Sequence, residues 1–191
     1  MAGTSTPEYE RHLATVLERI GEVSRALRWR QAVDAELSPL QVRIMGFIAQ
    51  HADAPIGVAR LADELQLSRP TISDSVRSLV EKGLLLRRAD PKDGRSHALQ
   101  LSAKARRTLD DGSPLDSAMA ALSASTKDGL LLALMQVLHQ LSNEGKVQVQ
   151  RMCWTCVHYD GDREASHRCL LLKKTLAVRD LRTDCPEHVA C

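Results

Sequence analysis

Cysteine is missing from the first 152 residues of this 191-residue chain, and aromatic side chains are scarce throughout. With one Phe, two Tyr and two Trp, the core must be built from Leu, Val, Ile and Ala, a composition that favours helices. No apolar run reaches the roughly 18 residues that a transmembrane helix needs. The N-terminal segment mixes acidic, basic and apolar positions and lacks the apolar centre of a signal peptide. These absences predict a soluble cytoplasmic protein that makes no membrane contact.

The chain also lacks a strong net charge and the signatures of an enzyme. Its formal charge is +2, so any binding to nucleic acid must depend on Lys and Arg that cluster locally. No nucleotide-binding loop, no pair of catalytic carboxylates and no nucleophile with a base beside it is recognisable. Asp110-Asp111 and Asp160-x-Asp162 are better explained as turn or helix-end residues. We therefore expect that the protein is not an enzyme.

Helical periodicity runs through most of the chain and predicts a mainly α fold of α+β type. A proline one residue after a Ser or Thr marks two helix starts, at Thr6-Pro7 and Ser38-Pro39. Apolar side chains recur at helical spacing after the first start, at Leu13, Val16, Leu17, Ile20, Val23 and Leu27. Helices are expected over residues 7–30, from 39 onward, 58–65, 69–82, 102–109, 115–122 and 130–141, and strands over 84–88 and 97–101.

The middle of the chain reads as a winged helix-turn-helix: helix, short helix, turn, helix and a two-stranded hairpin. The second helix presents short hydrogen-bonding groups and cations that suit base edges and phosphates: Arg69, Thr71, Ser73, Asp74 and Arg77. The hairpin carries four cations that could enter a minor groove or clamp the backbone: Arg87, Arg88, Lys92 and Arg95. Taken alone, these cations could be a solvated surface, and Thr71, Ser73 and Asp74 could be ordinary helix-start residues.

In this region the sequence resembles the MarR family of bacterial regulators, over roughly residues 7 to 145. The wing Asp90-x-Lys92-Asp93-x-Arg95 and the exit Leu101-Ser102-x-Lys104-Ala105 carry the resemblance together. Further matching stretches are Leu37-Ser38-Pro39-Leu40-Gln41, Ile56-Gly57-Val58-Ala59-Arg60-Leu61-Ala62, Ser68-Arg69-Pro70-Thr71-Ile72-Ser73 and Leu79-Val80-Glu81-Lys82-Gly83-Leu84.

The resemblance implies a homodimer, paired through its terminal helices, that reads a pseudo-palindromic operator in double-stranded DNA. It also implies that Asp90 and Arg95 shape the wing and that Arg95 touches the minor groove. On this basis we expect four segments: an N-terminal dimerisation helix (1–36), a winged helix-turn-helix DNA-binding domain (37–110), C-terminal dimerisation helices (111–150) and a cysteine-rich tail that binds a metal or cluster (151–191).

The tail departs from the family pattern and holds all five cysteines, spaced Cys153-x2-Cys156-x12-Cys169-x15-Cys185, with Cys191 as the last residue. In a reducing compartment such a cluster indicates metal binding or redox chemistry rather than structural disulfides. A C-x-x-C pair places two sulfurs on one turn, and two more thiolates complete a tetrahedral set. We expect Cys153, Cys156, Cys169 and Cys185 to be the metal ligands and Cys191 to lie outside the set.

Four interpretations of the tail remain open. One C-x-x-C pair followed by two single cysteines, with Pro186 directly after Cys185, favours an iron–sulfur cluster, [4Fe–4S] over [2Fe–2S]. The second interpretation is zinc, held by four thiolates or by three with His158, His167 or His188. Reversible disulfide exchange without a metal is the third, and five unrelated buried cysteines the fourth. We also expect the leucine-rich stretch 170–181 to pack as a short helix over the site.

The sequence thus predicts a MarR-type DNA-binding transcriptional regulator, a repressor, whose iron–sulfur cluster senses redox state, oxygen, nitric oxide or iron. In this hypothesis cluster assembly orders the tail against the helices that form the dimer. The alternative is a MarR-type regulator with a structural zinc site in the tail and a pocket for a small-molecule effector.

Overall fold

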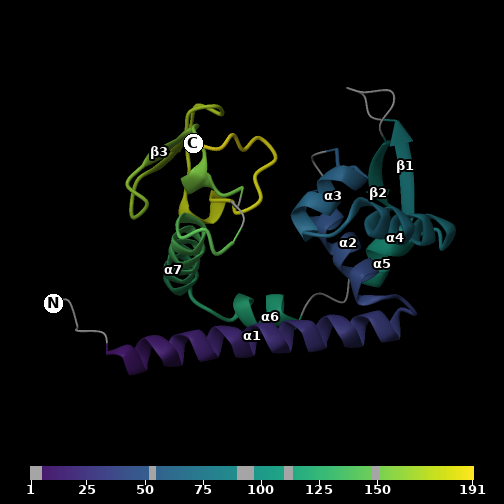
Figure 1. The fold of residues 1–191 in the computed structure, drawn as a ribbon, viewed down its shortest axis with the longest axis horizontal. Helices are drawn as coiled ribbons and strands as arrows, with labels where there is room; N and C mark the ends of the chain where they lie inside the picture. The colour runs from purple at the N-terminus through teal and green to yellow at the C-terminus, as the bar shows by residue number, and fades with distance from the viewer. Residues whose placement is uncertain (1–5, 52–54, 90–96, 110–113, 148–150) are drawn as a thin grey trace. The chain divides into compact units, whose positions relative to one another are not determined.

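The computed structural model describes residues 6–51, 55–89, 97–109, 114–147 and 151–191 (Figure 1). Its helices and two small sheets confirm the prediction of a mainly α chain. The chain divides into two compact units, Met1–Ser117 and Ala118–Cys191, which we describe separately. Among the described residues, the longer helices are too polar to cross a membrane. The helices and strands of the first unit are α1 (Pro7–Asp34), α2 (Pro39–Gln50), α3 (Val58–Leu65), α4 (Arg69–Glu81), β1 (Leu85–Ala89), β2 (His97–Leu101) and α5 (Ala103–Leu109).

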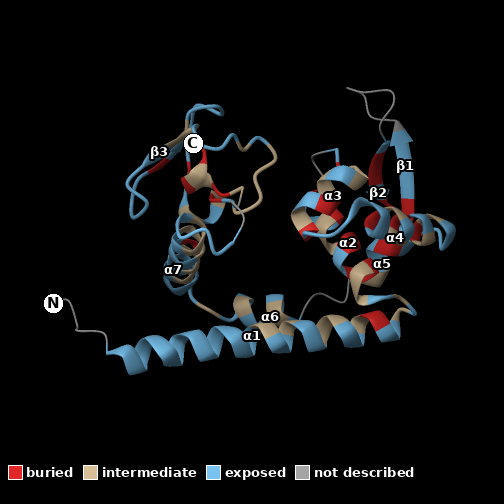
Figure 2. Cartoon of the chain, viewed as in Figure 1, coloured by how far each residue is buried: buried red, intermediate tan, exposed pale blue. Residues whose placement is uncertain are grey.

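Helix α1 begins where Thr6-Pro7 predicts and runs to Asp34, one turn beyond the predicted end. Along its length Ala32 is the one side chain that is buried (Figure 2). Its apolar stripe of Leu13, Val16, Leu17, Ile20 and Val23 stays between 39% and 48% exposed. An apolar face of this width is normally buried against another element. Within a single chain, therefore, α1 leaves a large apolar surface in contact with water.

The core of the first unit is built from α2, α3, α4, the hairpin and α5. Helix α2 begins with a capping box: the Ser38 hydroxyl accepts from the Gln41 N–H at 3.2 Å, and the Gln41 side chain accepts from the Ser38 N–H at 3.0 Å. The Gln41 amide also donates to the Ser78 hydroxyl of α4 at 3.0 Å. The fully buried centre consists of apolar side chains, among them Ile44, Met45, Ile56, Leu61, Ile72, Val76, Leu79 and Leu85.

The helix-turn-helix is formed by α3, α4 and the turn between them. Gln66 ends α3 in the left-handed conformation, with φ +54°. Ser68 then caps α4 by accepting from the Thr71 N–H at 3.2 Å, as the sequence predicts. Gly83, at φ +68°, follows the last turn of α4 and ends the helix two residues before β1 begins. The strands pair antiparallel with Leu85 opposite Leu101, so the hairpin extends directly from the helix-turn-helix core.

The second unit joins helix α7 (Ala124–Asn143) to the cysteine-rich tail. The short helix α6 (Pro114–Ala120) lies at the boundary between the units. Helix α7 begins six residues before the predicted start because Ser123 caps it, accepting from the Thr126 N–H at 3.2 Å. The tail contains two 3₁₀ turns, η1 (Cys153–Thr155) and η2 (Val178–Asp180), and a sheet of β3 (Tyr159–Gly161), β4 (His167–Cys169) and β5 (Lys174–Thr175).

The tail and α7 share one small hydrophobic core. Met135 of α7 is fully buried, and Met152, Trp154, Leu176 and Leu181 of the tail pack in the same cluster. Three further α7 leucines lie partly buried against it: Leu131, Leu132 and Leu138. Folding of the tail therefore depends on the apolar face of α7.

The expected helix over 170–181 is wrong. Residues 170–173 form the turn between β4 and β5, where Lys173 adopts φ +51°, a conformation that ends helical structure. Strand pairing places Cys169 opposite Lys174, and η2 follows. The leucine spacing predicted a buried helical face, but Leu170, Leu171 and Leu172 lie in the exposed turn.

Candidate functional site

The second helix of the helix-turn-helix, α4, presents its predicted polar face to solvent. Arg69, Thr71, Asp74 and Arg77 are exposed, and Ser73 is half-buried. The Arg77 guanidinium lies 3.3 Å from the Asp74 carboxylate, one turn away. The Thr71 hydroxyl shares a 2.7 Å hydrogen bond with the Ser68 hydroxyl, so it takes part in the cap. Two cations on this face, Arg69 and Arg77, thus remain accessible to a polyanion.

The hairpin places one predicted cation beside α4. Successive residues of a strand point to opposite faces, so Arg87 and Arg88 diverge. Arg87 of β1 and Ser73 of α4 line the same surface hollow, of about 400 Å³, together with His97 and Leu99 of β2. Arg88 is also exposed, whereas Lys92 and Arg95 lie outside the described residues. The sequence reading did not include His97 in this surface.

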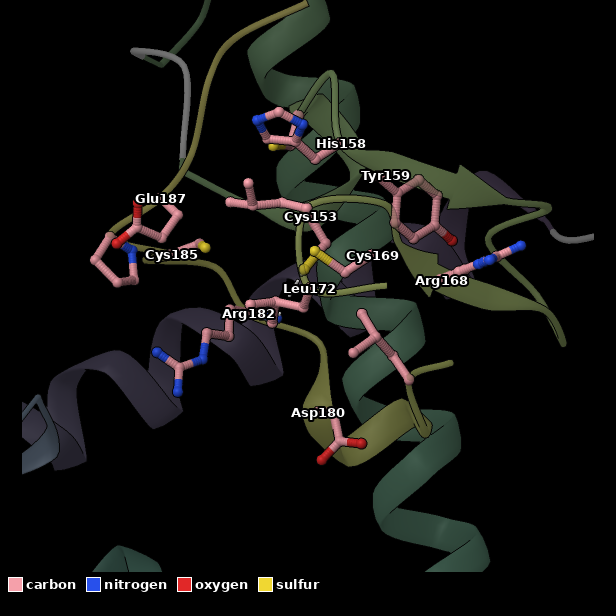
Figure 3. Close-up of a pocket in the computed structure, with 14 residues that line it drawn as sticks. Cys153, His158, Tyr159, Arg168, Cys169, Leu172, Asp180, Arg182, Cys185 and Glu187 are labelled. Carbon is pink, nitrogen blue, oxygen red and sulfur yellow. Dashed lines mark hydrogen bonds between the residues drawn. The ribbon is translucent and has the colours of Figure 1, made fainter. Parts of the chain in front are cut away.

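The four cysteines predicted as metal ligands line a single cavity of about 250 Å³ (Figure 3). They come from separate segments: Cys153 and Cys156 from the turn at η1, Cys169 from β4, and Cys185 from the loop before Pro186. Cys191 is exposed and is not among the lining residues. Most of the remaining wall is formed by Leu171, Leu172, Leu176, Tyr159, Arg182 and Pro186.

Backbone hydrogen bonds hold the cysteine-bearing segments together. The Cys156 N–H donates to the Cys153 carbonyl at 3.1 Å, which closes the C-x-x-C turn. The Cys153 N–H donates to the Arg182 carbonyl at 2.9 Å, and the Arg182 N–H donates back to the Cys153 sulfur at 3.4 Å. The Cys185 N–H donates to the Arg151 carbonyl at 2.9 Å. Segments from both ends of the tail are thereby fixed around the cavity.

The thiols of the cavity lie in a partly desolvated environment. Burial raises the pKa of Cys153, and the N–H of Arg182 partly offsets this increase. Burial likewise raises the pKa of Cys185, while the N–H of Glu187 and the charge of Arg182 act in the opposite direction. Backbone N–H groups that donate to cysteine sulfurs commonly orient and stabilise the thiolates of metal and iron–sulfur centres. The sequence did not predict the contacts of the Arg182 and Glu187 N–H groups with the cysteines, because these groups belong to the main chain.

The three histidines considered as ligands differ in their surroundings. His158 lines the cavity. His167 is 2% exposed, and its Nδ1 lies 2.8 Å from the Tyr159 hydroxyl. The Nε2 atom of His188 lies 2.9 Å from the Thr155 hydroxyl. All five cysteines are free thiols, and within the described ranges no three His, Cys, Asp or Glu side chains are placed as they stand to hold a metal ion.

Part of the first unit is similar to a known protein family. Residues 35–96 match the family model described as MarR family. This stretch contains α2, α3, α4 and β1, the greater part of the winged helix-turn-helix. Among curated proteins none matches the chain.

Solved structures show the same fold at low sequence identity. A MepR mutant from a multidrug-resistant S. aureus clinical isolate is 19% identical, with a TM-score of 0.56, and the match covers 68% of this chain and 96% of that one. A MarR transcriptional regulator from Methanosarcina mazei Go1 is 15% identical, with a TM-score of 0.53 and coverage of 68% and 96%. The S. aureus MepR–DNA complex is 18% identical, with a TM-score of 0.51 and coverage of 67% and 97%.

Proposed function

We propose that this chain, whose winged helix-turn-helix is of the MarR type, is a dimeric DNA-binding transcriptional regulator, a repressor, with an iron–sulfur cluster bound in its cysteine cavity. The cluster senses redox state, oxygen, nitric oxide or iron. The observation that carries the sensing part is that Cys153, Cys156, Cys169 and Cys185 line one cavity. The protein acts by binding rather than by catalysis.

DNA binding is supported by the α4 surface and by the comparisons. Arg69, Thr71 and Arg77 are exposed on one helix, and Arg87 lies beside it on the hairpin. This arrangement suits a helix that enters the major groove while the wing contacts the backbone. The S. aureus MepR structure with the same fold was solved as a DNA complex.

Dimerisation is supported by the exposed apolar stripe of α1. Five aliphatic side chains at helical spacing remain at least 39% exposed in the single chain. A second copy of α1, or of the terminal helices together, would remove this surface from water. Pairing two chains also presents two α4 helices, which is what a pseudo-palindromic operator requires.

The cavity favours a cluster over a single ion. Zinc draws four sulfurs to about 2.3 Å from one point, whereas the four cysteines here are spread along the wall of a cavity of about 250 Å³. A [4Fe–4S] cluster takes four cysteine thiolates as ligands, the same number as line the cavity. When bound, it would supply reversible one-electron chemistry and sensitivity to oxidants. The chain's own part is to hold the thiolates, aim the N–H groups of Arg182 and Glu187 at two of them, and cover the site with Leu171, Leu172 and Leu176.

Metal and sulfide analysis of anaerobically purified protein tests the cluster. We expect a brown protein with about four iron and four sulfide per chain. Cys169→Ala should abolish this content, and Cys191→Ala should keep it because Cys191 does not line the cavity. A colourless protein that carries one zinc per chain would refute the cluster while leaving DNA binding intact.

DNA binding requires a separate experiment because the operator is undefined. A duplex selected from a random-sequence library by the full-length protein serves as the probe, and fluorescence anisotropy gives the affinity without air. We expect a two-fold-related consensus and a difference in Kd between cluster-loaded and chelator-stripped protein. Equal Kd values in the two states would remove the sensing role.

A further inference from the structure

Trp154 lies between the first two cysteines of the cavity and packs against α7. Its side chain is 5% exposed and shares a hydrophobic cluster with Met135, the fully buried side chain of α7. The indole also meets the His139 ring of α7 edge-on, with 6.2 Å between the ring centroids and 75° between the planes. One residue of the C-x-x-C motif is thus a core residue of the helix packing.

The turn that carries Trp154 is tight enough to transmit a displacement. Cys153–Thr155 forms a 3₁₀ turn, closed by the 3.1 Å bond from the Cys156 N–H to the Cys153 carbonyl and by the 3.2 Å bond from the Thr155 N–H to the Met152 carbonyl. With three residues per turn, Cys153 and Cys156 share one side and Trp154 points away from it. The sulfurs line the cavity while the indole occupies the α7 core.

We infer that Trp154 couples occupancy of the cysteine cavity to the packing of α7. The inference rests on the proposed cluster and names how its presence is passed on. Bonds from a bound centre to Cys153 and Cys156 would restrict the turn, and a restricted turn would hold the indole in the cluster that contains Met135. By linkage the effect is reciprocal, so an intact α7 core also retains the centre more tightly.

Hydrogen exchange of the full chain, measured without air, tests this coupling from the tail side. Loading the cluster should slow exchange in peptides from α7 by about tenfold in the unmodified protein, the order of ordinary coupling. Trp154→Leu should still load iron and sulfide, yet show less than about a twofold change in α7. Trp154→Phe, which keeps a ring, should recover most of the effect. Trp29→Leu, at an exposed position of α1, is the matched control and should behave as the unmodified protein.

Iron release tests the same coupling from the helix side and does not depend on how Trp154→Leu folds. Met135→Ala removes the fully buried α7 member of the indole's cluster and should speed loss of iron to a chelator by about tenfold. Val137→Ala, at a 46% exposed position of the same helix, should release iron at the unmodified rate.

The two experiments separate the failures. Protein that never takes up iron and sulfide refutes the proposed cluster. Protein that loads normally but shows no protection of α7, or in which Trp154→Leu keeps the full effect, overturns the coupling. Release from Met135→Ala at the unmodified rate also overturns it.

Discussion

Arg77 and Asp74 lie one turn apart on the exposed face of α4, and their charged groups are 3.3 Å apart. Both side chains are well exposed, at 62% and 69%, so water and salt screen the pair and it contributes little to stability. Breaking the ion pair with Asp74 therefore costs little free energy, so the Arg77 guanidinium can bind a phosphate or a guanine edge instead. A helix that only needed to fold would gain almost nothing from this arginine.

Arg77→Ala is expected to weaken binding to the selected duplex by about 1–3 kcal/mol, roughly 5- to 150-fold, through loss of a charge-assisted contact. The unfolding midpoint should hardly change. Arg19→Ala is the matched control, because Arg19 forms the same kind of exposed pair with Glu22 at 3.7 Å on α1. Anisotropy titrations measure both, and equal losses in the two variants would argue against a role of α4 in the groove.

Gln41 shows how one buried polar side chain can serve two elements. It is 7% exposed, accepts from the Ser38 N–H at the start of α2 and donates to the Ser78 hydroxyl of α4. A buried group that loses its partner costs more than a satisfied hydrogen bond contributes. Ser78 has the helical position of a solvent-facing residue. Its contact with Gln41 explains why it is half-buried and not exposed.

Gln41→Leu should lower the free energy of unfolding by about 0.5–1.5 kcal/mol, because the Ser38 N–H and the half-buried Ser78 hydroxyl both lose their partner. Urea unfolding followed by circular dichroism measures the change. Gln100→Leu, at an exposed position of β2, should stay within about 0.5 kcal/mol of the unmodified protein. Comparable losses in the two variants would contradict the bridging role of Gln41.

At the scale of elements, the turn after α4 sets where the wing begins. Gly83 adopts φ +68°, and a Cβ added there would meet no atom within 4 Å. The requirement for glycine is therefore one of backbone conformation and not of space. Directly after it, the Leu84 N–H donates to the Leu79 carbonyl at 2.8 Å, which turns the chain from helix into strand.

Gly83→Ala should cost about 1–2 kcal/mol, the penalty of a left-handed conformation for a residue with a Cβ. Gly46→Ala makes the same chemical change inside α2, where the added Cβ also has space. It should stabilise the protein by about 0.5–1 kcal/mol. Opposite signs in thermal unfolding support the conformational argument, and the same sign for both would contradict it.

At the scale of the whole molecule, α1 has an exposed apolar stripe that a second protein chain would cover. A helix of 28 residues in which Ala32 is the buried side chain gains little stability from packing within its own chain. The exposed stripe is continuous over Leu13 to Val23. The proposed dimer removes this surface from water and fixes the distance between two α4 helices.

Ile20→Glu should raise the dissociation constant of the dimer by more than about 100-fold, because two apolar contacts are lost and two charges face each other. Thr15→Glu adds the same charge on the opposite face of α1 and should leave the dimer intact. Sedimentation velocity over a concentration series measures both. A dimer that tolerates Ile20→Glu would place the interface elsewhere.

Local chemistry near each helix end explains why so much of the first unit is predictable. Ser38 and Ser68 cap α2 and α4 where the sequence predicts, and Gly83 ends α4. Caps, proline positions and apolar periodicity act within a few residues, so they can be read from the sequence directly. The leucines at 170–172 show the limit of this reading, since strand pairing of Cys169 with Lys174 turned a helical pattern into a hairpin turn.

The sequence by itself determined the helices and hairpin of the winged helix-turn-helix, the polar face of α4 and the grouping of the cysteines. Only the tertiary structure decided that Cys153, Cys156, Cys169 and Cys185 line one cavity while Cys191 does not. It also decided that the Arg182 N–H meets the Cys153 sulfur and that Trp154 packs on α7. The physical reason is the distance along the chain over which each interaction acts. Capping and periodicity are short-range effects, whereas the cavity depends on backbone contacts between residues about 30 positions apart, which no local pattern encodes.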